Sequence, residues 1–278
     1  MAAARVTPGM AGLIVNGLLF GAAVATVVPL VWMVSVSFMS PGEASAFPPP
    51  LVPGQPTLAN YRELFGHAGM GRYLVNSVVL TAAVTLVSLS FNVAAGYAFA
   101  KLPFAGRDRI FKSLLAALVI PGQVAMVPLF LLLKQLGLVN SYGGVIVPAM
   151  ASIFGIFVVR QYALSIPDQI LESARIDGAS EFGIFRRVIV PVLKPIIVTL
   201  AVFTALGTWN DFMWPLIVLN DSDLYTLPVA LASLSREHVQ DNELMMAGAV
   251  VTTLPVLVVF LILQRYYVEG IMLGSVKG

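Results

Sequence analysis

One charged segment stands out in this apolar sequence, because it holds several side chains that could bind another protein. It covers Glu172–Pro195 and reads ESARIDGASEFGIFRRVIVPVLKP. Two of its carboxylates, Glu172 and Asp177, lie beside small residues. Carboxylates accept hydrogen bonds from the arginines or backbone amides of a partner, and small residues let another backbone approach closely. These residue types therefore predict a docking surface.

Motifs for catalysis are absent from the sequence. It has no G-x-x-x-x-G-K-[ST] phosphate-binding loop, no HExxH metal motif and no nucleophile elbow. It has no cysteine, which excludes disulfides, thiolate metal ligands and cysteine nucleophiles. The two histidines, His67 and His238, fall in expected loops. We therefore expect no catalytic residue, no metal site and no cofactor on this chain, so that any ATP and magnesium bind to a partner chain.

A second polar group lies in the apolar run Pro195–Leu219. Asp211 is the acidic residue that we place inside a membrane span, where an ionisable side chain usually faces the interior of a helix bundle or a water-filled cavity. Aromatic rings suit the apolar face of a sugar, and Asn or Asp suits its hydroxyl groups. The candidates for lining a translocation path are therefore Trp209, Asn210, Asp211 and Trp214.

A structural role for the same residues stays open. Gly207 and Pro215 could break the helix, Asn210 or Asp211 could cap its restart, and the tryptophan rings could lie at the membrane interface. Further polar candidates inside spans have the same two readings, as path residues or as hydrogen-bonded links between helices; they are Asn76, Asn92 and Gln123.

The composition indicates that a membrane surrounds these residues. The chain has 278 residues, of which 58% are hydrophobic and only 11% charged. A soluble domain usually carries about 25% charged residues. The net charge of +2 gives no reason to expect nucleic acid as a partner. We expect an all-α polytopic membrane protein, with one transmembrane domain over residues 1–278.

Six windows are long and apolar enough to cross a bilayer, which takes about 20 residues each. The first continues to Phe38, so we expect an uncleaved helix there rather than a signal peptide. The windows are Leu13–Ser37, Tyr73–Phe99, Phe111–Leu133, Tyr142–Arg160, Pro195–Leu219 and Leu244–Leu263.

The basic residues predict the orientation of these spans. Lys and Arg are enriched in cytoplasmic loops, and most of them fall inside when both termini are cytoplasmic. The exceptions are Arg62, Arg72, Lys134 and Arg236. The outer surface then consists mainly of Ser40–Arg72 (residues 40–72), which carries the run FPPPLVPGQP, and of Asn220–Glu243. Residues 164–194 form the largest cytoplasmic loop.

This cytoplasmic loop has the signals of two short helices. Ser165 and Pro167 are typical of a helix start, and Gly178 of a helix end. A second helix is expected over Phe182–Val190, with Phe182, Phe185 and Ile189 on a shared side. From the residues alone, the loop could dock a partner or lie on the membrane with its basic side chains against anionic lipid.

The loop resembles the EAA loop of ABC-transporter permease subunits. The matching residues are Glu172-Ser173-Ala174, Asp177-Gly178-Ala179 and Ile189-Val190-Pro191. The sequence departs from that pattern at Ser173, which replaces Ala, and at Val190, which replaces Leu. Three further stretches are similar to the carbohydrate-uptake, MalG-like branch, so the resemblance covers nearly the whole chain; they are the run from Ile120 to Pro128, LGTWNDFMWPL and QRYYVEGIMLGSVKG.

The resemblance implies a permease subunit of a binding-protein-dependent importer in a bacterial inner membrane. The EAA loop would dock an ATPase through Glu172, Ser173, Ala174, Asp177, Gly178, Ala179 and Pro191. The tail would contact the ATPases through Gly274, Ser275, Val276 and Lys277. The implied partners are a MalF-like permease, two ABC ATPase subunits and an extracytoplasmic solute-binding protein.

Other functions remain compatible with the sequence. The same architecture could import glycerol phosphate, an amino acid or a peptide. A strongly anionic solute would favour basic residues in the path, and the six windows hold basic residues only at their ends, at Lys112 and Arg160. A secondary transporter working alone would need its own ion-coupling charges or an internal repeat, and Asp211 is the one acidic candidate. A membrane scaffold without transport is the third alternative.

Overall fold

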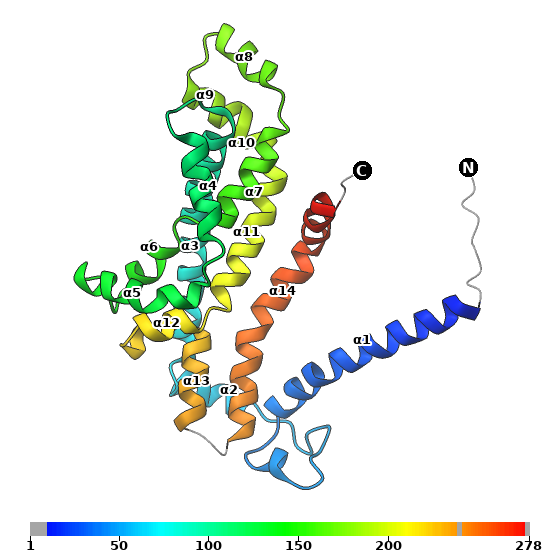
Figure 1. Ribbon diagram of the computed structural model, residues 1–278. Coiled ribbons are helices and arrows are strands. Elements are labelled where there is room, and N and C mark those ends of the chain that lie inside the picture. The colour runs from blue at the N-terminus through cyan, green and yellow to red at the C-terminus, as the bar shows by residue number, and fades with distance from the viewer. Residues whose placement is uncertain (1–9, 238–240, 276–278) are drawn as a thin grey trace. The chain divides into compact units, whose positions relative to one another are not determined.

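The computed structural model describes residues 10–237 and 241–275, and within these ranges every regular element is a helix (Figure 1). Backbone contacts divide the chain into two compact units. Unit 1 is Met1–Met70 with Leu231–Thr253, and unit 2 is Gly71–Ala230 with Leu254–Gly278. The expectation of an all-α membrane protein is confirmed.

Unit 1 contains the N-terminal helix and most of the predicted extracytoplasmic residues. Its helices are α1 (Met10–Ser37), η1 (Glu43–Ser45) and α2 (Ala59–Gly66). The proline-rich segment between η1 and α2 forms no regular element. It is fixed by Glu43, whose carboxylate accepts hydrogen bonds from the backbone N–H groups of Ser40 and Gly54. These hydrogen bonds lower the pKa of Glu43 below its ordinary value.

Unit 2 holds most of the remaining helices and the predicted cytoplasmic loop. Its helices are α3 (Met70–Lys101), α4 (Arg107–Ala117), α5 (Gly122–Gln135), α6 (Tyr142–Ala149), α7 (Ile153–Leu164), α8 (Asp168–Ile176), α9 (Glu181–Ile184), a π-helix (Phe185–Ile189), α10 (Val190–Val192), α11 (Lys194–Trp209), α12 (Met213–Val218) and η3 (Ser222–Leu224). Two further helices contribute residues to both units, namely α13 (Leu227–Glu237) and α14 (Asn242–Ser275).

Four segments of the described chain are long and apolar enough to cross a membrane. They are Gly12–Ser37, Met70–Lys101, Tyr142–Leu164 and Asn242–Ile262. Two helix pairs qualify only together, because α4 and α5 meet at a bend of 106° and Glu181–Val192 meets α11 at 75°. The chain has six candidate spans if each bent pair is one span.

Two of the predicted windows contain helix breaks that hydropathy does not report. The predicted window Phe111–Leu133 is interrupted between α4 and α5 because Pro121 disfavours a helical conformation at Ile120. The window Pro195–Leu219 is interrupted after Trp209, and α12 restarts at Met213. Neither window is one straight helix.

The helices α3 and α7 approach closely at a glycine. A Cβ atom added at Gly96 would lie 2.5 Å from Val159 Cγ1 and 3.1 Å from the backbone nitrogen of Arg160. Small residues at such crossings let membrane helices pack backbone to backbone. The contact fixes α7, which leads directly into the cytoplasmic loop.

Candidate functional site

The predicted cytoplasmic loop folds into a helical hairpin, which we call the coupling module after its predicted role (residues 164–194). The first helix, α8, ends at Ile176, and Gly178 follows with a φ of 80°. This left-handed conformation is strained for residues with a side chain and open to glycine. Ser180 then caps α9 by accepting a hydrogen bond from the N–H group of Gly183. The predicted stop and restart signals are thus confirmed.

One side of the module packs into the core of unit 2. Leu171, Ile184, Ile189 and Leu193 are buried there, in a cluster that also includes Tyr97 of α3. The predicted shared side of the second helix is wrong in part, because Phe182 is 71% exposed. The π-helix adds a residue to the turn, which shifts the buried face to Ile184 and Ile189.

The other side of the module carries the family-like residues. Glu172, Ser173, Asp177, Gly178 and Ala179 are all exposed. Ala174 is half-buried and packs against the core cluster, and Pro191 is exposed where α10 leads into α11.

Two exposed apolar side chains that sequence reasoning missed lie beside them. Ile176 is 86% exposed and Phe182 is 71% exposed. Contiguous apolar groups on a protein surface are typical of interaction sites. For Ile176, the available signal was an apolar residue between two charged neighbours, as in ARID.

An ion pair closes the hairpin. Arg175 Nε donates to Glu181 Oε1 at 2.7 Å, and Nη2 donates to Oε2 at 3.3 Å. The hydrogen bond from Arg175 lowers the pKa of Glu181 below its ordinary value, and the pKa of Arg175 rises correspondingly. Both side chains are exposed, so the pair fixes geometry more than it stabilises the fold.

A second feature is a cavity of about 470 Å³ among the spans of unit 2, which we call the polar cavity. Two helix breaks line it, the α6–α7 break through Ala149, Ala151 and Ser152, and the α11–α12 break through Asp211. Non-helical backbone at membrane depth is tolerated where it lines a cavity or is buried in protein. The other polar lining residues are Ser88, Asn92, Thr204 and Thr208.

The predicted path residues have different positions around this cavity. Asp211 lines it and accepts a hydrogen bond from the N–H group of Trp214 at 3.3 Å, so it also caps α12. Asn210 donates to the carbonyl of Leu206, at the end of α11. Trp214 is buried and donates to the carbonyl of Gly144, and Trp209 is buried as well. Of these four, Asp211 is the residue in the cavity wall.

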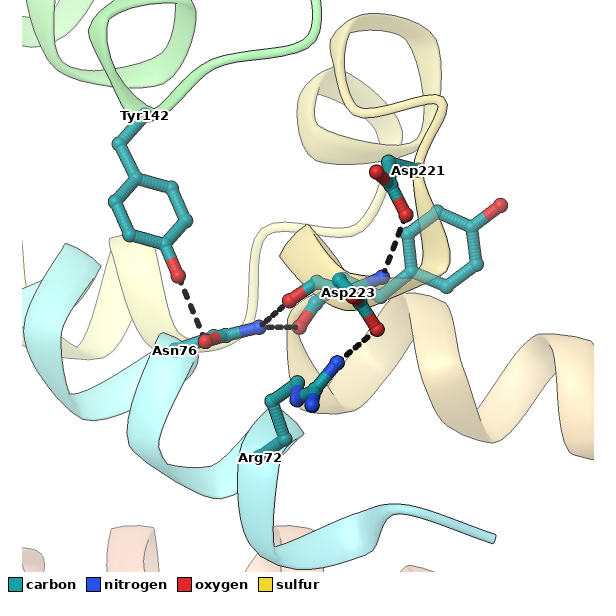
Figure 2. Close-up of polar contacts among 6 residues, drawn as sticks. Arg72, Asn76, Tyr142, Asp221 and Asp223 are labelled. Carbon is teal, nitrogen blue, oxygen red and sulfur yellow. Dashed lines mark hydrogen bonds and ion pairs between the residues drawn. The ribbon is translucent and has the colours of Figure 1, made fainter.

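Polar links between helices account for two of the other candidates. Asn92 accepts from the N–H group of Ser152 at 2.9 Å and donates to Ser88 Oγ at 3.1 Å. Asn76 donates to the carbonyls of Asp223 and Tyr225 and accepts from the hydroxyl of Tyr142 (Figure 2). Gln123 is exposed near the start of α5.

The predicted tail contacts fall at the end of α14. Gly274 and Ser275 are its last two residues. Val276 and Lys277 lie outside the described residues, as does His238. Among the described residues, no group of three or more His, Cys, Asp and Glu side chains could hold a metal ion.

Known proteins share both the sequence pattern and the fold. Residues 92–272 match the family described as binding-protein-dependent transport system inner membrane component. The chain is 36% identical over 277 residues, 99% of each protein, to the arabinooligosaccharides transport system permease protein AraQ of Halalkalibacterium halodurans. It is 31% identical to the lactose transport system permease protein LacG of Rhizobium radiobacter, with 92% of this chain and 93% of LacG covered.

A solved structure has the same fold. A chain of a bacterial ABC transporter involved in the import of the acidic polysaccharide alginate superposes with a TM-score of 0.83 at 23% identity, with 96% of this chain and 100% of that chain covered. With the family match over most of its length, the chain belongs to the family of binding-protein-dependent transport system inner membrane components, the multi-pass permease subunits of ABC transporters.

Proposed function

We propose that the chain forms half of the translocation path of an ATP-driven importer for a neutral oligosaccharide and docks an ATPase subunit through the coupling module. The observation that carries the docking role is the module's outer side. It combines exposed carboxylates at Glu172 and Asp177 with exposed apolar groups at Ile176 and Phe182. Such a mixture suits a protein cleft, which buries the apolar groups and pairs the charges.

The path role rests on the polar cavity. Hydroxyl, amide and carboxylate groups can hydrogen-bond to sugar hydroxyls, and none of the residues that line this cavity is basic. An anionic solute such as glycerol phosphate would favour basic side chains there. The relatives named for arabinooligosaccharide and lactose transport support a carbohydrate as the solute.

Partner chains complete the proposed importer. The chain itself contains no phosphate-binding loop, so ATP and magnesium would bind to two ATPase subunits. A MalF-like permease would supply the other half of the path. A related alginate transporter was solved in complex with its pentasaccharide-bound periplasmic protein, which supports an extracytoplasmic solute-binding protein here. Both termini, including the Gly274–Gly278 tail, would be cytoplasmic.

Transport by the reconstituted complex tests this proposal. The complex is purified through a tag on this chain, and the solute-binding protein encoded with it is screened against arabinotriose, lactose and glycerol 3-phosphate by thermal shift. We expect a sugar to raise the melting temperature and to enter proteoliposomes when ATP is present. Selective binding and uptake of glycerol 3-phosphate would contradict the carbohydrate assignment.

A further inference from the structure

The helix α3 buries polar side chains along one face, and three of them bind a joint of another segment. Residues four apart lie on the same face of a helix, and Lys101 follows Asn76 by about seven turns. The buried face contains Asn76, Leu80, Val84, Ser88, Asn92 and Tyr97. We call Asn76, Asn92 and Lys101 the three anchors of α3.

The first anchor holds the connection between α12 and α13, on the predicted outer side. Asn76 is 5% exposed, and its amide nitrogen donates to the carbonyls of Asp223 at 2.8 Å and Tyr225 at 3.0 Å. Its oxygen accepts from Tyr142, so Asn76 joins three segments (Figure 2). Arg72 also pairs with Asp223, but both side chains are more than half exposed.

The second anchor holds the α6–α7 break. Asn92 is 1% exposed and accepts from the N–H group of Ser152, the residue that caps α7. The fit is close, because a Cβ atom at Gly155 would lie 2.4 Å from the amide nitrogen of Asn92. Since Ser152 and Asn92 both line the polar cavity, this anchor is part of the cavity wall.

The third anchor holds the start of the coupling module. The Lys101 side chain is only 6% exposed, and its ammonium donates to the carbonyl of Ile166 and to Asp168, each at 2.6 Å. In a regular helix the N–H group of Ile170 would donate to the carbonyl of Ile166, but here it donates to the carbonyl of Pro167. Lys101 therefore supplies the partner of the Ile166 carbonyl at the turn into α8.

We propose that Asn76, Asn92 and Lys101 are positioning residues, through which α3 carries a displacement of α8 to the cavity wall and to residues 219–226. This inference rests on the proposed docking of an ATPase at the coupling module. A helix of 32 residues is about 48 Å long and moves as a rod. Buried hydrogen bonds at the joints would make α7 and the 219–226 loop follow the rod.

Thiol labelling of the whole complex can test this transmission. The chain has no cysteine, so Thr204→Cys places a single reporter of this chain in the polar cavity. In proteoliposomes, its rate of reaction with a charged maleimide is compared without nucleotide and with MgATP and vanadate. We expect the two rates to differ by about fivefold or more, the lower end of typical coupling between sites.

Substitution of Lys101 should remove this difference. With Lys101→Met, we expect the rate ratio to approach one while the ATPase subunits still co-purify, and Lys101→Arg should restore the difference. Lys112→Met removes an exposed lysine outside the anchors and should leave the ratio unchanged. Asn92→Ser, which removes the bond from α3 to Ser152 in the cavity wall, should also lower the ratio.

The outcomes separate the inference from the function on which it rests. A full rate difference in an assembled Lys101→Met complex would overturn the transmission through α3 and leave the docking role standing. If Lys101→Met prevents assembly, a full rate difference in the Asn92→Ser complex overturns the inference in the same way. If the labelling rate of Thr204→Cys is the same with and without nucleotide in the otherwise unsubstituted complex, both proposals are overturned.

Discussion

Asp211 combines two properties that the sequence could not separate. Its carboxylate lines the polar cavity and also caps α12 by accepting from the N–H group of Trp214. Removing a helix cap costs about 1 kcal/mol of stability, whereas a lost hydrogen bond to a charged group costs about 1.5–3 kcal/mol in binding. Two substitutions can therefore distinguish the cap from the contact with solute.

We predict that Asp211→Asn preserves the cap, because the amide oxygen can accept the same hydrogen bond. Its melting temperature should stay unchanged, while the KM for sugar uptake rises by about tenfold if the carboxylate binds solute. Asp211→Leu should lower both stability and uptake. Thermal unfolding and uptake of the purified complex provide the two measurements; normal uptake by Asp211→Asn would remove Asp211 from the path.

The ion pair between Arg175 and Glu181 predicts a pH dependence of the hairpin. Arg175 lowers the pKa of Glu181. The ion pair therefore stabilises the hairpin fully at a pH above the carboxyl's unfolded pKa of about 4.3. Its contribution is lost as the pH falls through the lower, folded value. Hydrogen exchange of residues 178–184 should be faster in Glu181→Gln than in the unsubstituted chain at neutral pH.

The difference between the two chains should vanish once Glu181 is protonated. Comparing the two proteins at each pH cancels the intrinsic pH dependence of exchange. A difference that persists unchanged well below the usual carboxyl pKa would show that the ion pair does not hold the hairpin.

Prediction from sequence was most successful for residues whose role is local. Ser180 and Gly178 act on their own backbone, so residue type and spacing were sufficient. The roles of Asn76 and Asn92 depend on segments about 60 or more positions away and could be stated from sequence only as alternatives. Trp214 looked like a path residue for the same reason, although it packs inside the protein.

Among the elements, the turn at Gly178 sets the angle between α8 and α9. No heavy atom lies within 4 Å of a Cβ atom added there, but the φ of 80° is unfavourable for side chains. We predict that Gly178→Val uncouples ATP hydrolysis from uptake, because left-handed backbone is very unfavourable for a β-branched residue. Asn tolerates this conformation best among other residues, so Gly178→Asn should retain most coupling.

Expression and ATPase association are the controls for the Gly178 variants. The measurement is the amount of sugar transported per ATP hydrolysed in proteoliposomes. Normal coupling in an assembled Gly178→Val complex would contradict the role of this turn.

The crossing of α3 and α7 should be sensitive to one methyl group. A Cβ atom at Gly96 would lie 2.5 Å from Val159 Cγ1, and overpacking of this kind costs about 1–3 kcal/mol. We predict a lower melting temperature for Gly96→Ala. Gly21→Ala in α1 is the matched control, since nothing lies within 4 Å of its Cβ; equal melting temperatures would contradict the close crossing.

Hydropathy predicted the existence of the spans better than their shape. A window average records how apolar a segment is, so it found Phe111–Leu133 without its interruption at Pro121. The π-helix after α9 escaped prediction because a hydropathy pattern assumes 3.6 residues per turn, whereas the buried residues Ile184 and Ile189 are five positions apart. The helix breaks matter most for function, since two of them line the polar cavity.

At the scale of the whole molecule, composition alone indicated a membrane protein, and the family match gives it a place in a transporter. Two features of the chain are consistent with a permease subunit that depends on a separate ATPase. The sequence has no nucleotide-binding motif, and the exposed apolar residues Ile176 and Phe182 lie on the proposed docking surface. A permease subunit needs both a path and a mechanical connection to an ATPase, and unit 2 contains a candidate for each.

Purification of the tagged chain from its native membrane in mild detergent, with mass spectrometry of the proteins that accompany it, tests the central claim most directly. We predict a P-loop ATPase and a second permease. Glu172→Lys should lose the ATPase and keep the permease, because Glu172 lies on the docking side of the module, whereas Asp108→Lys, in a different cytoplasmic loop, should keep both. Recovery of the chain alone, or an ATPase that remains bound to Glu172→Lys as tightly as to the unsubstituted chain, would contradict docking through the coupling module.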